Sequence, residues 1–220
     1  MSSSHLANEA APKRNRNDFS CQHRQEDGMK YFMTVGTTPL ACANSVYWYL
    51  RTGKGEIPER VWFIASEDPA GGPSHDSRTH IEAIETLLHE FLERTPRDDW
   101  YNICFETDDI IWIPEADLAQ GTRLIGDGIL KRCKVGDSIT IDATAGRKTM
   151  ATSAVLAGLA LYQKELYNVN FHYYWLREFR RESLGKKAYE LAVDEIESVL
   201  VPAEAIEHEL TGIRISEDID

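Results

Sequence analysis

The chain has 220 residues, of which 42% are hydrophobic and 27% are charged, and its formal net charge is −12. This length and composition are typical of one globular domain, or of one domain with an appendage. The acidic balance argues against a general nucleic-acid-binding surface, which needs a basic face, and no apolar run approaches the roughly 18–20 residues that span a bilayer.

Residues 1–28 are polar and contain a short basic stretch at Lys13, Arg14 and Arg16. Because such a segment has too few large apolar residues to form a core, we expect a disordered, solvated arm. Contact of the basic stretch with RNA is the alternative. No apolar segment follows Met1, so we expect no secretory signal and a cytoplasmic protein.

From residue 30 onward, short apolar runs alternate with stretches of helical periodicity. The pattern predicts strands at Tyr31–Val35, Val61–Ala65, Asn102–Glu106, Ser138–Ile141 and Val169–Trp175. It predicts helices after Pro39 through Leu50, over Ser77–Arg94, from Pro114 in a first turn to about Cys133, and over Lys148–Glu165. Strands that alternate with helices of this length indicate an α/β fold: a Rossmann-like, doubly wound, mainly parallel sheet with helices on both faces.

Residues 29–176 are therefore the predicted ligand-binding domain, and residues 177–220 are a C-terminal appendage. The appendage begins with a basic stretch (Arg177–Lys187), continues with two acidic amphipathic segments, and ends in an acidic tail at Ser216–Asp220. We expect it to be mostly helical, as two helices or as a helix and a short strand, and to lie against the edge of the domain.

The four cysteines form no CxxC pair and are widely spread, at Cys21, Cys42, Cys104 and Cys133. We expect free, reduced and mostly buried thiols, which agrees with a cytoplasmic location. No cluster of His, Cys and Asp suggests a metal, and we expect neither a metal nor a cofactor.

Ligands bind doubly wound sheets at the carboxyl ends of the strands, beside the topological switch point. Three predicted strand ends carry polar side chains or glycine there: Gly36–Pro39, Ser66–Asp68 and Asp142–Met150. In the third, Gly146 permits close approach of a ligand to the backbone, and Arg147 and Lys148 supply positive charge at a helix N-terminus. These are the parts of a phosphate site. The same residues fit a plain helix start equally well, with Asp142 and Thr144 as caps and Lys148 in solvent.

Two common nucleotide motifs are absent. A nucleotide-triphosphate P-loop needs a Gly-Lys pair with a glycine five residues earlier, and here Arg147 separates Gly146 from Lys148. A dinucleotide fingerprint needs two further glycines after Gly36, and none follows at that spacing. Both absences lower the expectation of an ATPase or a dehydrogenase.

The pattern Asp-x-Thr-x-Gly-x-Lys-x-Met at Asp142–Met150, with Gly-Thr-Thr-Pro at Gly36–Pro39, resembles the CARF family, the CRISPR-associated Rossmann-fold domains of type III CRISPR systems. The resemblance covers residues 30–176 and implies a homodimer that binds one cyclic oligoadenylate across its two-fold axis. The implied ligand-binding residues are Gly36, Thr37, Thr38, Ser66, Glu67, Asp142, Thr144, Ala145, Gly146, Arg147, Lys148 and Met150. The family usually has a second glycine where this chain has Ala145.

The resemblance implies two activities. As a ring nuclease, the protein opens the ring without a metal: Lys148 stabilises developing charge, and Thr37 or Thr38 positions the 2′-hydroxyl or a phosphate oxygen. Ring nucleases of the family often have serine in the first loop, so the stiffer threonine favours the alternative of a sensor that holds the ring without cleaving it. A sensor passes its signal to the C-terminal segment or to a separate effector partner. A generic Rossmann-like sugar or nucleotide binder is a third reading.

An effector domain within the chain is not expected. The HEPN ribonucleases attached to many family members carry an Arg-x4–6-His motif, and His208 has no arginine at that spacing before it. The segment after Trp175 is too short for most other nuclease domains. A membrane effector is also disfavoured, because the sequence has no apolar run long enough to span a bilayer.

Overall fold

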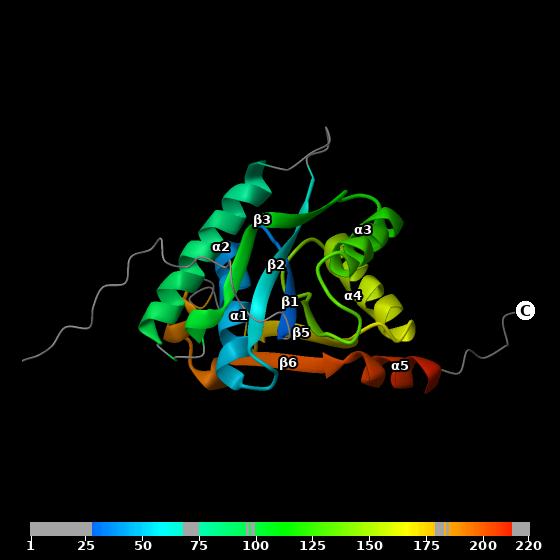
Figure 1. Cartoon of the computed structure of the whole chain (residues 1–220). Helices are drawn as coiled ribbons and strands as arrows, with labels where there is room; N and C mark the ends of the chain where they lie inside the picture. Colours follow the sequence, from blue (N-terminus) through cyan, green and yellow to red (C-terminus); the bar gives the residue numbers. More distant parts are fainter. Residues whose placement is uncertain are drawn as a thin grey trace, which may run out of the picture.

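The computed structural model describes residues 28–67, 75–95, 97, 100–178, 183 and 185–212. The predicted arm, apart from Gly28, and the acidic tail lie outside the described residues. The strands are β1 (Met29–Thr34), β2 (Pro58–Ser66), β3 (Cys104–Ile113), β4 (Ser138–Asp142), β5 (Asn168–Leu176) and β6 (Ile196–Pro202). They form one sheet in the order β3-β2-β1-β4-β5-β6, in which β1 to β5 are parallel and β6 is antiparallel to β5 (Figure 1).

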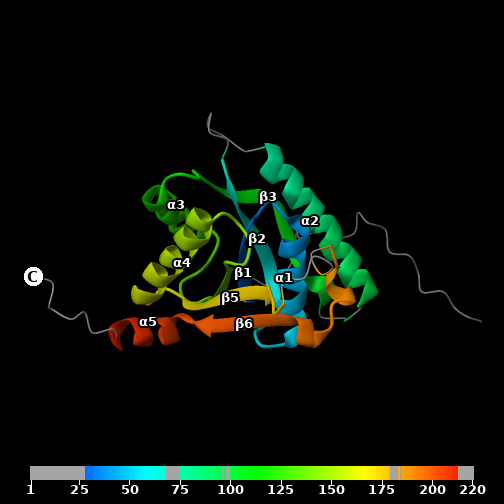
Figure 2. The same ribbon diagram turned by 180° about the vertical axis from the view of Figure 1, so that it is seen from behind.

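Helices cover both faces of this sheet. Helices α1 (Pro39–Thr52) and α2 (His75–Arg94) lie on one face, and α3 (Leu118–Leu130) and α4 (Lys148–Gln163) lie on the other (Figures 1 and 2). Helix α5 (Ala203–Gly212) follows β6, and short 3-10 turns occur at Trp100–Asn102, Ala188–Glu190 and Val193–Glu195. The predicted fold class, a doubly wound and mainly parallel α/β sheet, is confirmed.

The core is divided by the sheet into two layers. Because side chains alternate along a strand, Tyr31 and Met33 of β1 pack under α1 and α2, while Phe32 packs under α3 and α4. All six residues of β1 are buried, as expected for a central parallel strand covered on both sides. Glycine brings α4 close to the sheet, since a Cβ at Gly158 would lie 2.7 Å from Cδ1 of Ile141.

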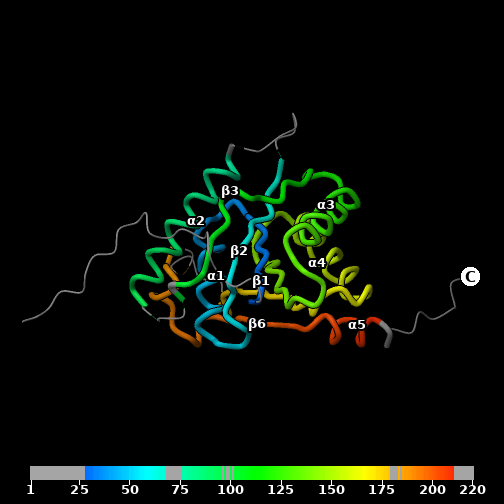
Figure 3. The backbone as a smooth tube through the Cα atoms, in the orientation of Figure 1, coloured from blue at the N-terminus to red at the C-terminus, as the bar shows by residue number. Residues whose placement is uncertain are grey.

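The region after Trp175 takes the second of the two predicted arrangements, a short strand and a helix at the edge of the domain, rather than two helices. It adds β6 to the sheet, because Ile196 and Ser198 are buried while Glu197 and Val199 are only partly buried, a strand period rather than a helical one. Ala188, Leu191 and Ile196 join the core under α1 and α2. The tube in Figure 3 shows β6 running along the sheet edge into α5, which contacts α4.

Two further expectations are corrected. Helix α3 does not begin at Pro114, because β3 continues through Ile113; it begins at Leu118, and the Asp117 carboxylate caps it by accepting the amide of Gln120 at 2.8 Å. Among the cysteines of the described residues, Cys42 and Cys133 are free, but Cys104 is disulfide-bonded. Burial raises the pKa of both the Cys42 and the Cys133 thiol to about 12, so neither is a ready nucleophile.

Candidate functional site at the carboxyl ends of β1 and β4

The sheet order reverses between β1 and β4, because β2 follows β1 on one side and β5 follows β4 on the other. This is the switch point at which doubly wound folds bind ligands. The loop after β1 and the loop after β4 both start there. They touch: a Cβ added at Gly36 would lie 2.8 Å from the backbone nitrogen of Gly146 and 3.3 Å from Cβ of Ala145. The topology thus joins two segments that are about a hundred residues apart in sequence.

Gly146 has a backbone conformation that other residues rarely adopt, with φ at +92°. It also packs tightly, since a Cβ there would lie 3.1 Å from both Cβ of Thr34 and Sδ of Met150. The Thr34 hydroxyl points at the carbonyl oxygens of Asp142, at 3.0 Å, and of Ala145. Both dihedral angle and packing therefore require glycine at position 146.

Asp142 is the buried anchor of the loop. Its side chain is 1% exposed. One carboxylate oxygen, Oδ1, accepts the amide of Thr144 at 2.8 Å, and the other, Oδ2, accepts the hydroxyls of Tyr31 at 2.8 Å and of Ser45 at 2.7 Å. The protein itself thus supplies partners to both oxygens, and the carboxylate shapes the loop. Contact of Asp142 with a ligand stays a prediction.

A chain of hydrogen bonds from α1 and β5 ends on this carboxylate. The amide of Tyr174 donates to Oγ1 of Thr144 at 2.8 Å, which leaves the Thr144 hydroxyl to donate to Oγ of Ser45 at 3.0 Å. Because the Ser45 hydroxyl donates its proton to Asp142, each donor in this series of hydrogen bonds has one acceptor. Thr144, like Asp142, is thus used within the protein.

A second chain reaches the same carboxylate from β6. Nδ1 of His172 lies 2.8 Å from the hydroxyl of Tyr31, and its Nε2 lies 2.9 Å from the hydroxyl of Ser198. Because the Tyr31 proton is directed at Asp142, the hydrogen-bond pattern assigns a proton to Nδ1. Ser198 of β6 is therefore connected to the β4 loop through two buried side chains.

The pKa of Asp142 reflects these contacts. Burial alone would raise it, but the His172 ring and the hydrogen bonds from Thr144 and Ser45 lower it, and the net direction is below 3.8. Burial raises the pKa of the Tyr31 hydroxyl well above its usual value, and the neighbouring Asp142 charge raises it further. The network therefore holds an ionised carboxylate and a protonated phenol at the base of the loop.

The exposed polar groups at this edge are a different set of residues. Thr37, Thr38 and Lys148 are exposed, and neither threonine hydroxyl bonds to another described residue. Lys148 is the first residue of α4, where backbone amides lack helical partners. Arg147, also exposed, makes an ion pair with Glu115, which reduces the charge that it offers to an anion. These groups line the side of the two loops that faces solvent.

The remaining predicted site residues lie nearby in different roles. Met150 is buried against Gly146, and Ala145 packs against the core under α1. Ser66 is the last residue of β2 and Glu67 follows it, one strand away from the switch point. The hydroxyl of Ser66 lies 3.2 Å from that of Ser77. Contact of Ser66 or Glu67 with a ligand stays a prediction.

Sequence reasoning missed Tyr31, Ser45, His172 and Ser198. Each lies inside an apolar run or helix, where a polar residue is easily read as part of an ordinary amphipathic pattern. One signal was available. When strands β4 and β5 are aligned in parallel, His172 lies opposite Asp142, and both polar positions are flanked by core residues, which indicates that they are partners.

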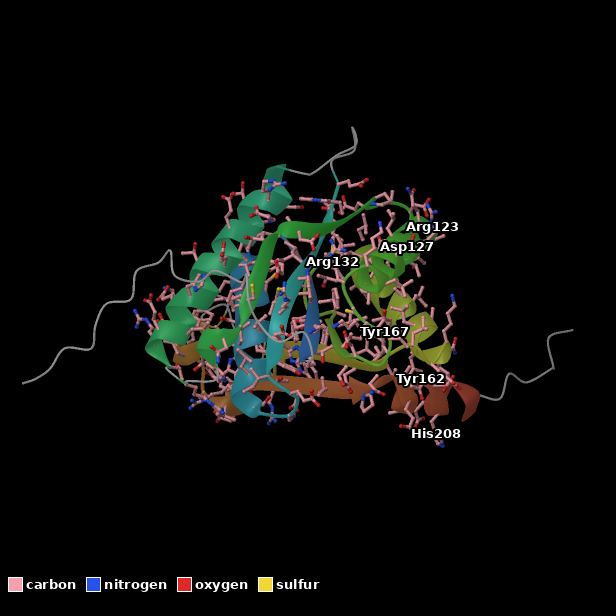
Figure 4. All side chains as sticks on the ribbon, in the orientation of Figure 1. Arg123, Asp127, Arg132, Tyr162, Tyr167 and His208 are labelled. Carbon is pink, nitrogen blue, oxygen red and sulfur yellow. The ribbon has the colours of Figure 1, made fainter. Side chains whose placement is uncertain are left out.

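The described residues contain neither a membrane-spanning helix nor a cluster of metal ligands. None of their helices is both long and apolar enough to cross a membrane, and none of their His, Cys, Asp and Glu side chains gather in groups of three or more that suit a metal ion. His208 projects from α5 away from the sheet (Figure 4).

No family model matches the sequence, and no curated protein matches it. Among solved structures, Csm6 of Enterococcus italicus bound to cyclic hexa-2′-fluoro-hexa-dAMP superposes with a TM-score of 0.49 at 13% identity, over 84% of this chain and 44% of that one. Protein VC1899 from Vibrio cholerae gives a TM-score of 0.36 at 15% identity, over 65% of this chain and 30% of that one. The chain thus spans less than half of each structure. Both scores lie below 0.5, and neither structure enters the functional assignment.

Proposed function

We propose that this chain is a CARF-type protein that binds a cyclic oligoadenylate at the solvent-facing side of its β1 and β4 loops. The observation that carries the proposal is the contact between Gly36 and Gly146, which brings both motif segments of the sequence to one edge. Two threonine hydroxyls, the exposed Lys148, which pairs with none of the described carboxylates, and helix N-terminal amides then face solvent at this edge. These groups suit the alternating ribose and phosphate of a nucleotide ring.

The proposed binding unit is a homodimer. A ring of identical nucleotides has rotational symmetry, and two copies of the same loops across a two-fold axis present identical groups to both of its halves. One copy of the chain offers only one β1 loop and one β4 loop. Binding of the whole ring therefore requires a second copy.

The proposed reaction opens the ring without a metal. The ribose 2′-oxygen attacks the adjacent phosphorus and loses its proton, the bond from phosphorus to the 5′-oxygen breaks, and that oxygen gains a proton. The products are a 2′,3′-cyclic phosphate and a 5′-hydroxyl. Lys148 stabilises the charge that develops on the phosphoryl oxygens, and Thr37 or Thr38 holds the 2′-hydroxyl in line. His172 does not take part directly, since its ring is buried and both nitrogens bond within the protein.

A sensor that binds without cleaving is the second candidate. It is favoured by the connection from the β4 loop through Tyr31 and His172 to Ser198, because a shift of the loop on binding would act on the strand that leads to the C-terminal segment. Such coupling requires two discrete arrangements of the network with different ligand affinities. A separate effector partner would read the change.

One experiment separates the candidates. Purified chain is incubated with cyclic tetra- and hexa-adenylate in the presence of a metal chelator, and the products are resolved by chromatography. Linear products ending in a cyclic phosphate, lost in Lys148→Ala, support the ring nuclease. Tight binding of a ring that stays intact for hours supports the sensor. No binding of either ring overturns the proposed function.

A further inference from the structure

Two large aromatic side chains are exposed near the carboxyl end of β5. Tyr173 is 48% exposed and Trp175 is 40% exposed. Their ring centroids are 5.4 Å apart with the planes tilted by 40°, so the two rings form one continuous surface. Exposed aromatic pairs are informative because a folded chain gains free energy by burying such rings.

The pair adjoins the proposed ligand site. Strand β5 pairs with β4 only as far as His172, opposite Asp142, so residues 173–176 continue past the end of β4 beside the loop that follows it. The strand between the two rings contacts that loop, since the amide of Tyr174 donates to Oγ1 of Thr144. Tyr173 and Trp175 alternate with Tyr174 and therefore share the sheet face of Phe171, the face on which α4 lies.

Two residues of β6 flank the pair. On β6, Val199 lies opposite Tyr173, and Glu197 lies opposite Trp175. Glu197 is held by Arg177 at 2.7 Å, so its charge is partly neutralised at the rim. Two exposed aromatic rings beside the ion pair of Glu197 and Arg177 suit a flat, uncharged ring better than a phosphate.

We propose that Tyr173 and Trp175 form a nucleobase-binding subsite, on which a purine base of the ligand stacks while the β1 and β4 loops hold its sugar-phosphate backbone. This proposal rests on the proposed function and adds the residues that recognise the base. Stacking on an aromatic side chain contributes about 1–3 kcal/mol per base, which corresponds to roughly five- to 150-fold in affinity.

The exposed area favours a small ring over a protein partner as the occupant. Aromatic residues bury about 150–250 Å² each, so the exposed parts of these two amount to roughly 200 Å². A stable protein interface needs about 800 Å² on each partner. The aromatic pair alone is therefore too small for subunit docking, whereas its area is comparable to that of one purine face.

The test uses the full chain and the variants Tyr173→Ala, Trp175→Ala and Trp175→Phe, with Leu130→Ala as an exposed apolar control at the end of α3. Affinity for cyclic tetra- and hexa-adenylate is measured by calorimetry. Circular dichroism checks folding, and sedimentation checks the oligomeric state. We expect each alanine variant at β5 to bind about ten- to a hundredfold more weakly, while Trp175→Phe and Leu130→Ala stay near wild type.

Fluorescence gives an independent measurement. Of the other four tryptophans, Trp112 is partly buried and the remaining three are at most 4% exposed: Trp48, Trp62 and Trp100. A base that stacks on Trp175 should therefore quench the fluorescence of the most exposed tryptophan, and Trp175→Phe should remove that quenching, which a base near Trp112 would not explain. Wild-type binding that neither alanine variant weakens overturns the subsite and leaves the proposed function intact. If the alanine variants change the oligomeric state in the absence of ligand, this surface is a subunit contact, and the proposed subsite is overturned as well. Absence of wild-type binding overturns both.

Discussion

The amide of Tyr174 lies 2.8 Å from Oγ1 of Thr144, and this hydrogen bond joins strand β5 to the loop that follows β4. It makes the motif threonine part of the protein framework, and contact of Thr144 with a ligand stays a prediction. The motif residues therefore have two roles. Asp142 and Thr144 hold the loop in place through hydrogen bonds within the protein, whereas Lys148 and the threonines of the first loop face solvent. Substitutions in the buried group should therefore change stability, and substitution of Lys148 should change the reaction with the ligand.

Lys148→Ala should lower the rate of ring opening by about a hundred- to a thousandfold, as removal of one charge-stabilising donor does elsewhere. The affinity for the ring should fall much less, because helix amides and hydroxyls remain. The rate is measured by chromatography with and without chelator. Lys164→Ala at the other end of α4 is the matched control and should behave like wild type. A Lys148→Ala chain that cleaves at the wild-type rate contradicts the assigned role.

Gly146→Ala should destabilise the fold by about 1–2 kcal/mol, because alanine strains a backbone at φ +92° and its Cβ crowds Thr34 and Met150. Urea unfolding measures the change. Gly126→Ala on α3 is the control, since no atom lies within 4 Å of a Cβ there, and it should leave stability equal or raise it by up to about 1 kcal/mol. Equal effects of the two substitutions would argue against the constrained loop.

Asp142→Asn should destabilise the fold by roughly 1–3 kcal/mol at neutral pH, because its amide hydrogens would meet the donors that now point at the carboxylate. The effect should depend on pH. The folded-state pKa is lowered below 3.8, so the carboxylate stabilises the fold above its unfolded-state pKa, and that contribution is lost as the pH falls through the folded-state value. The stability difference between wild type and variant should therefore be constant from neutral pH to about pH 4 and should narrow below it.

The measurement for this variant is the free energy of unfolding over that pH range. Asp127→Asn is a suitable control, since Asp127 is an exposed carboxylate on α3 (Figure 4). A difference that stays constant down to the lowest pH at which the protein folds would show that Asp142 is not the ionised acceptor of the network.

Ser45→Ala should weaken ligand binding although Ser45 is fully buried in α1. The substitution leaves the Thr144 hydroxyl without its acceptor and removes one donor from Asp142, at a cost of about 1–3 kcal/mol in stability. Thermal unfolding and ring affinity are measured together. Thr152→Ala, at an exposed position of α4, should change neither.

A chain that ends at Leu176, the predicted domain boundary, should fold poorly. It would leave β5 as an unpaired edge, remove Ala188, Leu191 and Ile196 from the core, and leave His172 without Ser198. Circular dichroism and thermal unfolding of residues 29–176 check this against the full chain. A cooperative transition close to that of the full chain would support the boundary at residue 176 instead.

The sequence determined the fold class and most of the sheet. Central parallel strands such as β1 and β4 are apolar throughout because both of their faces are covered, and that local pattern survives in any tertiary context. The pattern was misleading where the environment changes within a segment. β3 runs on through Asp108 and Asp109, which are exposed, and β6 lies at an edge where half-buried residues imitate an amphipathic helix.

The motif at Asp142–Met150 was likewise visible in the sequence, together with its position at a strand end. What only the tertiary structure decided is which motif residues face inward. That distinction depends on Tyr31, Ser45 and His172, which come from three other elements and meet Asp142 only after the sheet has formed. A buried carboxylate is stable only when such partners converge on it, and no local pattern specifies partners that are a hundred residues away. The same assembly decides that Tyr173 and Trp175 stand exposed beside the loop.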